Sequence, residues 1–119
     1  MSKLIDLKTF TDKRGNLTVF EADFNIKRVF YIYGVDDSIR GGHRHKKTIQ
    51  VATCIQGSCV IYSNDGFDED IYHLTSPSQG ILLNPEDWHK MYNISSDAIL
   101  MVFASEYYDE SDYIYEKYD

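Results

Sequence analysis

Hydrophobic and polar residues alternate with a period of two along most of the chain. Short runs of this kind, rich in Val, Ile, Tyr and Phe, are typical of β-strands that bury one face. We therefore predict strands at residues 16–22, 28–35, 48–55, 58–64, 70–76, 79–85 and 98–104, each bounded by Gly, Asn, Asp, Ser or Pro. Strands at such close and even spacing predict an all-β fold, an antiparallel jelly-roll barrel or sandwich.

Two turns between these strands have explicit signals. The sequence IQGSCV at residues 55–60 predicts a tight hairpin in which Gly57 supplies a positive φ. The sequence SNDGFD at residues 63–68 predicts an Asp-Gly turn between the next two strands. We find no helical stripe longer than two turns. The tail after Ser105 contains five tyrosines, and its pattern fits either a short helix or an extended arm.

Length and charge narrow the classes of function. At 119 residues the chain is expected to form one domain, residues 1–119, with its own core. The net charge of −7 argues against a nucleic-acid partner, because phosphate neutralisation needs a basic face. No apolar run approaches the length of a membrane span or of a signal peptide, so we expect a cytoplasmic protein without a membrane partner. The acids gather at residues 64–70 and in the tail, which leaves the first half locally basic and suited to an anionic small molecule.

The two cysteines are expected to be structural. Cys54 and Cys59 are five residues apart in what the pattern predicts as one strand, so their side chains should point to opposite faces. Such a pair cannot form a local disulfide. We interpret both as small buried residues rather than as a redox pair.

Histidines dominate the candidate chemistry. His43 and His45 are two residues apart, so in a strand both imidazoles face the same way. Gln50 and Gly57 follow at the spacing of the first cupin motif, G-x5-H-x-H-x3,4-E-x6-G, with Gln in place of Glu, and HKMYN at residues 89–93 resembles the H-x3-N end of the second motif. We therefore predict that His43, His45 and His89 converge at the mouth of a small barrel, where barrels commonly bind ligands.

The same segment bears on metal binding. Gln50 stands where the cupin pattern has a carboxylate ligand, and an amide is a weak ligand. Three histidines alone can still hold zinc, with water in the fourth position. The positive charges of residues 40–47 would repel a divalent cation and attract phosphate. We predict that this site holds no metal.

Taken together, the motifs RVFYIYGV, RGGHRHKKTIQ, CIQGSCV and FASEYYDESDYIYEKY, with DKRGNL near the start, resemble the sugar 3,4-ketoisomerases. These cupin-fold enzymes act on dTDP-4-keto-6-deoxyglucose. The resemblance covers nearly the whole chain and implies a homodimer of jelly-roll subunits without a cofactor. It also implies a place in making 3-amino-3,6-dideoxy sugars for surface polysaccharide or glycoprotein.

The reaction suits histidine. Shifting the ketone from C4 to C3 requires removal of the C3 proton, an enediol, and proton return at C4, which general bases near neutral pKa serve best. We predict His45 as the base at C3 and His43 as the partner that moves the second proton, although the order can be reversed. Tyr31 is predicted to stabilise the enediolate, with Tyr33 beside it on the same strand face.

The remaining candidates bind substrate. Arg40 is a further candidate for the enediolate and, with Lys46, is predicted to grip the diphosphate, while Gln50 hydrogen-bonds a sugar hydroxyl or an imidazole. Arg44 should point away from the histidines. Arg14 and His89 match the branch of the family that gives the galacto product, so we expect dTDP-3-keto-6-deoxy-D-galactose.

Other functions stay open at this point. One is a metal-dependent small cupin enzyme that uses His43, His45 and His89. Another is a non-catalytic protein that binds a nucleotide sugar through the same histidines. A 3,5-epimerase would need a second dedicated base for C5, and the sequence offers none.

Overall fold

The computed structural model describes residues 1–36 and 38–119. Its strands are β1 (Lys3–Asp6), β2 (Lys8–Asp12), β3 (Gly15–Val19), β4 (Arg28–Ile32), β5 (Arg40–His45), β6 (Gln50–Gln56), β7 (Cys59–Asn64), β8 (Glu69–Leu74), β9 (Gln79–Leu83), β10 (Trp88–Tyr92), β11 (Ile99–Ala104) and β12 (Tyr113–Ile114), with a 3-10 turn at Glu110–Asp112. In this part of the chain no helix is long and apolar enough to cross a membrane.

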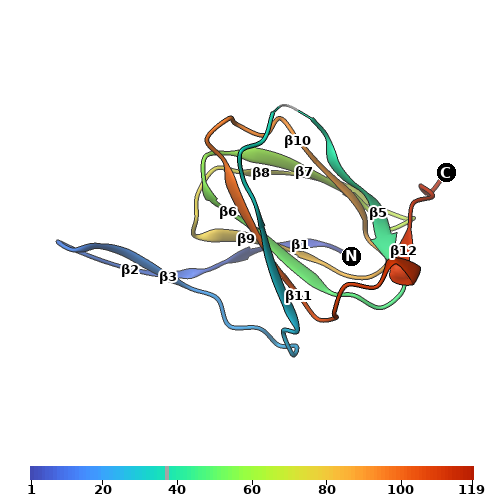
Figure 1. The fold of residues 1–119 in the computed structure, drawn as a ribbon, viewed down its shortest axis with the longest axis horizontal. Helices are drawn as coiled ribbons and strands as arrows, with labels where there is room; N and C mark the ends of the chain where they lie inside the picture. Colours follow the sequence, from blue (N-terminus) through green and yellow to red (C-terminus); the bar gives the residue numbers. More distant parts are fainter. Residues whose placement is uncertain (37) are drawn as a thin grey trace.

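Two antiparallel sheets pack face to face (Figure 1). Sheet I has the strand order β1-β9-β6-β11-β4, and sheet II has the order β12-β5-β10-β7-β8. Between them lies a core to which both sheets contribute, including Ala52, Leu100 and Val102 from sheet I and Ile61 and Met91 from sheet II. The predicted all-β antiparallel sandwich is confirmed, and all seven predicted strands are present. The predicted ranges do not include β1, β2, β5, β10 or β12.

The chain crosses repeatedly from one sheet to the other, and this corrects one predicted turn. Strands β6 and β7 belong to different sheets, so Gly57 lies at a corner between the sheets and not in a hairpin. Gly57 does have a positive φ of 76°, and a Cβ there would lie 2.3 Å from Oγ of Ser95 and 2.8 Å from Cα of Ala98. The Asp-Gly turn is confirmed, because β7 and β8 pair with Asn64 opposite Glu69.

The same corner corrects the interpretation of the cysteines. Cys54 lies on β6 and Cys59 on β7, so they do not share a strand, and both side chains enter the core. The neighbouring thiol lowers the pKa of Cys54 and raises that of Cys59, while Sγ of Cys54 donates to the carbonyl of Gln56 at 3.1 Å. Their buried position is as predicted, but their placement on opposite faces of one strand is wrong.

Two segments lie outside the sandwich core. The β2–β3 hairpin pairs within itself and projects away from both sheets (Figure 1). The C-terminal tail is mainly extended, which settles the question that its pattern left open, and β12 pairs with β5 at the edge of sheet II. Beyond β12 the tail follows sheet II, where Nε1 of Trp88 donates to the carbonyl of Tyr115 at 3.1 Å and the ring of Tyr118 covers the guanidinium of Arg44.

Candidate active site

Three imidazoles meet on the inner face of sheet II. His43 lies directly opposite His89 across β5 and β10. Their ring centroids are 4.9 Å apart, and the ring of His45 lies 5.0 Å from His43 and 6.0 Å from His89. His45 and His89 are only 4% and 2% exposed, while His43 is half-buried. The convergence expected from the two sequence motifs is therefore present.

Backbone geometry brings these rings close together. Gly41 has a φ of 84°, and a Cβ there would lie 3.0 Å from the carbonyl oxygen of His89, so only glycine permits this approach of β5 to β10. The backbone N–H of His45 donates to the carbonyl of Pro85 at 2.8 Å. Arg44, between the two histidines, points to the outer face as expected, with its guanidinium 4.1 Å from the ring of Tyr118.

The histidines are neutral at physiological pH. Burial lowers the pKa of all three from 6.5 to about 4. Repulsion from a neighbouring imidazole lowers the pKa of His43 and His45 further. Nδ1 of His89 is 3.1 Å from the carbonyl oxygen of Asp87, whereas Nε2 of His45 is buried and has no hydrogen-bond partner among the described residues. A buried imidazole nitrogen without a partner can exchange a proton with a ligand.

The C-terminal tail completes this face with a residue that the sequence reasoning missed. Tyr113 on β12 pairs with His45, and its ring centroid lies 4.6 Å from that of His43 and 4.7 Å from that of His45. Next to it, buried Asp112 accepts hydrogen bonds from the backbone N–H groups of Lys46 and Lys47. The hydroxyl of Thr48 donates to the same carboxylate. These bonds fix the tail to the segment that follows His45.

Gln50 lies on the opposite wall. It shares the inner face of β6 with Ala52 and Cys54 and is buried. Its neighbours across sheet I are Leu83 on one side and Ala104 on the other. Ala104 in turn lies opposite Arg28, a second residue that the sequence reasoning missed. The positive charge of Arg28 contributes to lowering the pKa of both His43 and His45, so it lies near them.

The structure does not bring Tyr31 and Tyr33 to the histidines. Both are exposed, at 61% and 68%, and they stack on one another with centroids 5.7 Å apart. With residues 55, 99 and 101 they line an apolar hollow of about 340 Å³ on the outer face of sheet I. The inward residues of this strand are Phe30 and Ile32 instead. Within one chain, the predicted enediolate contact of Tyr31 is therefore wrong.

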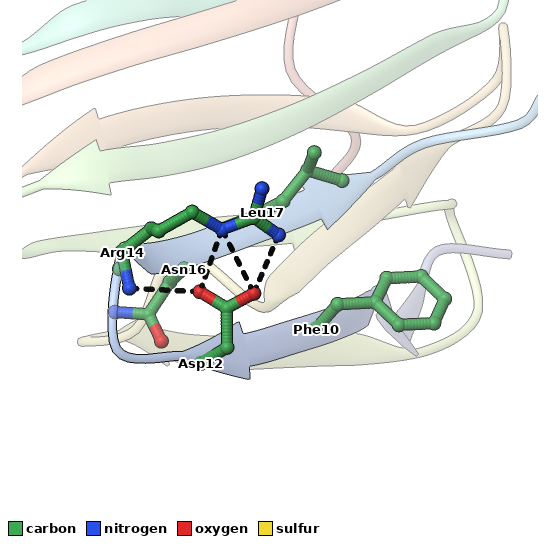
Figure 2. A pocket seen from close by; sticks show the side chains of 6 residues that line it. Phe10, Asp12, Arg14, Asn16 and Leu17 are labelled. Atoms are coloured by element: carbon green, nitrogen blue, oxygen red, sulfur yellow. Dashed lines mark hydrogen bonds and ion pairs between the residues drawn. The ribbon is translucent and has the colours of Figure 1, made fainter.

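Arg14 also lies apart from the cluster. It sits in the turn of the β2–β3 hairpin and folds back on Asp12, with an Nη2–Oδ2 distance of 2.6 Å, beside a hollow of about 350 Å³ (Figure 2). Arg40 and Lys46 are exposed, Arg40 at the start of β5 and Lys46 just after its end. Among the described residues, no group of three or more His, Cys, Asp and Glu side chains is arranged to hold a metal ion.

Comparison with known proteins gives a consistent result. The family model FdtA (WxcM-like, C-terminal) matches residues 1–119. A curated relative, TDP-4-oxo-6-deoxy-alpha-D-glucose-3,4-oxoisomerase of Aneurinibacillus thermoaerophilus, is 43% identical over 99% of this chain and 88% of its own length.

Solved structures agree with the family model. The crystal structure of QdtA, a sugar 3,4-ketoisomerase from Thermoanaerobacterium thermosaccharolyticum in complex with TDP, is 43% identical with a TM-score of 0.91, over 97% of this chain and 88% of that one. A mutant of the same protein in complex with TDP-4-keto-6-deoxyglucose is 42% identical with a TM-score of 0.91, over 97% of this chain and 87% of that one.

Proposed function

The chain belongs to the FdtA family of sugar 3,4-ketoisomerases, and we propose that it moves the keto group of TDP-4-keto-6-deoxyglucose from C4 to C3. The observation that carries the proposal is the cluster of three neutral imidazoles, one with a buried nitrogen that has no partner among the described residues. The complexes of QdtA with TDP and with the keto sugar support this choice of substrate.

His45 is the proposed base at C3, because its Nε2 is buried and has no hydrogen-bond partner in the described chain. It removes the C3 proton, and the electron pair moves toward the C4 ketone to give an enediolate. O4 is then protonated, the O3 hydroxyl loses its proton, and C4 receives a proton. His43, with its ring 5.0 Å from that of His45, is the proposed partner for the second pair of transfers. Positive charge from Arg28 stabilises the enediolate.

A single experiment tests the reaction. The protein is incubated with TDP-4-keto-6-deoxyglucose in deuterated water, and the sugar is followed by NMR. We expect a 3-keto product with deuterium at C4. Deuterium exchange at C3 without a new ketone would indicate a stalled base, and neither exchange nor product would indicate a protein that only binds the nucleotide sugar.

The galacto configuration of the product is also a proposal. It rests on the match of Arg14 and His89 to that branch of the family. His89 lies in the histidine cluster, but Arg14 lies on the projecting hairpin. The coupling between H4 and H5 of the product decides the point, because an axial H4 with a large coupling would mean the gluco product.

We propose a homodimer, for which the hairpin supplies a structural reason. Phe10 and Leu17 on its two strands are 53% and 60% exposed, and Tyr31 and Tyr33 leave a second apolar surface on sheet I. Apolar side chains exposed at this level favour burial against a partner. Sedimentation equilibrium at micromolar concentration should give twice the mass of the chain, and a monomer would refute the proposal. A cytoplasmic location and a place in 3-amino-3,6-dideoxy sugar synthesis accompany the proposed reaction.

A further inference from the structure

Tyr113 brings a phenol to the histidine cluster from the C-terminal tail. It pairs directly with His45 where β12 lies beside β5 (Figure 1). Side chains that are paired in this way on neighbouring strands lie on the same face of a sheet, here the inner face of sheet II. The ring centroid of Tyr113 is 4.6 Å from that of His43 and 4.7 Å from that of His45. The ring therefore packs against both imidazoles that the proposed proton transfers use.

Backbone hydrogen bonds fix the position of this ring. The N–H of Tyr113 donates to the carbonyl of Glu110, which closes the 3-10 turn in front of β12. The carbonyl of Asp112 accepts from the N–H of Lys46 at 2.9 Å. Because these bonds join the tail to the residue that directly follows His45, the phenol and the imidazole are held side by side.

The reaction needs a donor of this kind. The three imidazoles are neutral, and the base among them must offer its acceptor nitrogen to the sugar. Removal of the C3 proton places negative charge on an oxygen atom of the enediolate, which hydrogen-bond donors stabilise. The sequence predicted Tyr31 for this role, but Tyr31 lies on the outer face of sheet I. Tyr113 offers the same chemical group at the cluster itself, and it is only half-buried, so a ligand can reach it.

We propose that Tyr113 is a further catalytic residue whose hydroxyl donates a hydrogen bond to O4 of the sugar, an inference that rests on the proposed function. The bond forms to the C4 ketone and strengthens as the electron pair of the broken C3–H bond moves toward O4. His45 takes the C3 proton, and the phenol keeps its own. Arg28 supplies positive charge from sheet I, while Tyr113 supplies a hydrogen bond from the edge of sheet II.

Steady-state kinetics with TDP-4-keto-6-deoxyglucose compare the wild type with Tyr113→Phe and with the control Tyr107→Phe. Tyr113→Phe removes one oxygen atom and keeps the ring. Tyr107 belongs to the same tail, but it is 72% exposed and its ring lies against Lys27. We expect Tyr113→Phe to lower kcat by roughly 10- to 100-fold, because a donor to developing charge acts mainly in the transition state. KM and TDP affinity should stay within about twofold of the wild type, and Tyr107→Phe should match the wild type throughout.

A second measurement reports the same hydrogen bond without turnover. The keto sugar, labelled with ¹³C at C4, is bound to His45→Asn and to His45→Asn/Tyr113→Phe. The stretching band of the ketone is then recorded by isotope-edited infrared spectroscopy. A hydrogen bond to a carbonyl oxygen weakens the C=O bond, so the band should lie at higher frequency in the double variant. Tyr107→Phe in the same background should leave the band where it is.

Two results would overturn the proposal: a kcat of Tyr113→Phe within about twofold of the wild type, or a ketone band that does not move in the double variant. Equal losses of kcat and of TDP affinity would also overturn it, because they indicate a structural role. A wild type that does not convert the keto sugar refutes the proposed function instead. In that case a shifted band would retain the contact between Tyr113 and the ketone, and an unshifted band would refute this contact as well. Thermal melts of each variant verify folding.

Discussion

The histidine cluster and the β2–β3 hairpin hold their functional side chains in different ways. In the cluster, each residue is fixed by contacts from distant parts of the same chain: β5 pairs with β10 on one side and with β12 on the other. In the hairpin, β2 and β3 pair only with each other, and Arg14 contacts a carboxylate two residues away. The cluster is held by contacts between distant parts of the chain, whereas the hairpin is held by contacts between residues close in sequence.

Burial explains why this difference matters for the proposed chemistry. Desolvation shifts the pKa of the three imidazoles to about 4, so each is neutral and can accept a proton at pH 7. In the exposed Arg14–Asp12 pair, the hydrogen bonds from Arg14 lower the pKa of Asp12 instead, and water weakens the attraction between the two charges. Mutations should therefore have large effects in the first region and small effects in the second.

The largest expected effect follows from replacing His45. His45→Asn removes the nitrogen proposed to take the C3 proton, and turnover should fall by roughly 10² or more, the usual contribution of a positioned base. TDP affinity should change little, because the diphosphate is held elsewhere. Steady-state kinetics with TDP-4-keto-6-deoxyglucose, together with calorimetry of TDP binding, measure both quantities.

His73→Asn is the control for this change, because His73 is the remaining histidine and lies exposed on β8. It should keep wild-type turnover. A His45→Asn enzyme with near-normal turnover would remove His45 from the role of base.

The second prediction compares one carboxylate from each region. Asp112→Ala removes a buried acceptor of three hydrogen bonds and leaves the N–H of Lys47 and the hydroxyl of Thr48 without that acceptor, while the N–H of Lys46 keeps its bond to the backbone carbonyl of residue 112. The free energy of unfolding should fall by roughly 3 kcal/mol, since buried charged acceptors are costly to lose. Asp12→Ala breaks an exposed ion pair in the hairpin and should leave that free energy essentially unchanged. Urea unfolding of both variants measures these free energies. Equal losses of stability in Asp112→Ala and Asp12→Ala would contradict the difference between the two regions.

The fold was largely predictable because alternation is a local property. It identified seven of the twelve strands, and the spacing of His43 and His45 assigned both to one face with Arg44 on the other. It could not select the inward face of β4, because Phe30 and Ile32 are apolar on one side and Val29 and Tyr31 on the other. Arg28 was missed for the same reason: Tyr31 was predicted to face the site, and Arg28 lies on the opposite face of the strand.

Contacts distant in sequence account for the other misses. The turn at Gly57 looks locally like a hairpin, and only sheet membership shows that it is a corner. Asp112 and Tyr113 lie in an acidic tail whose pattern favours no element. Their relation to His45 depends on a strand of two residues and on hydrogen bonds that span 64 to 66 positions. No local signal encodes such a pairing.

The third prediction concerns pH. The folded pKa of each clustered histidine is about 4, and the ordinary value is 6.5. Below pH 6.5 the unfolded chain therefore binds more protons, and stability falls as the pH drops from 6.5 toward 4. His45 and His89, both buried, should each contribute roughly 2 kcal/mol, so we expect a loss of stability of roughly 4 kcal/mol between pH 7 and 5, with a smaller share from the half-buried His43. Urea unfolding at several pH values between 7 and 5 measures the free energy of unfolding. In a His89→Asn variant this free energy should depend less steeply on pH.

The same pKa values determine how kcat/KM changes at low pH. A base with a pKa of about 4 stays unprotonated well below neutrality, so kcat/KM should remain level down to about pH 5 and then decline. An acid limb centred near 6.5 would mean that the essential base has an ordinary histidine pKa and is not the buried His45.

The smallest expected effect is the response to a chelator. If side chains alone complete the cluster, prolonged treatment with a strong chelator should leave turnover unchanged. The reason lies in the chemistry of the donors: the position that holds a carboxylate ligand in the cupin pattern is Gln50, whose amide binds metals weakly. The positive charge of Arg28 opposes the binding of a divalent cation at the cluster. Turnover is measured before and after treatment, and then again after zinc, manganese or iron is added back separately.

Turnover that is lost to the chelator and restored by one metal would mean that the three histidines act as ligands. The proton-transfer role of His45 would then have to be abandoned.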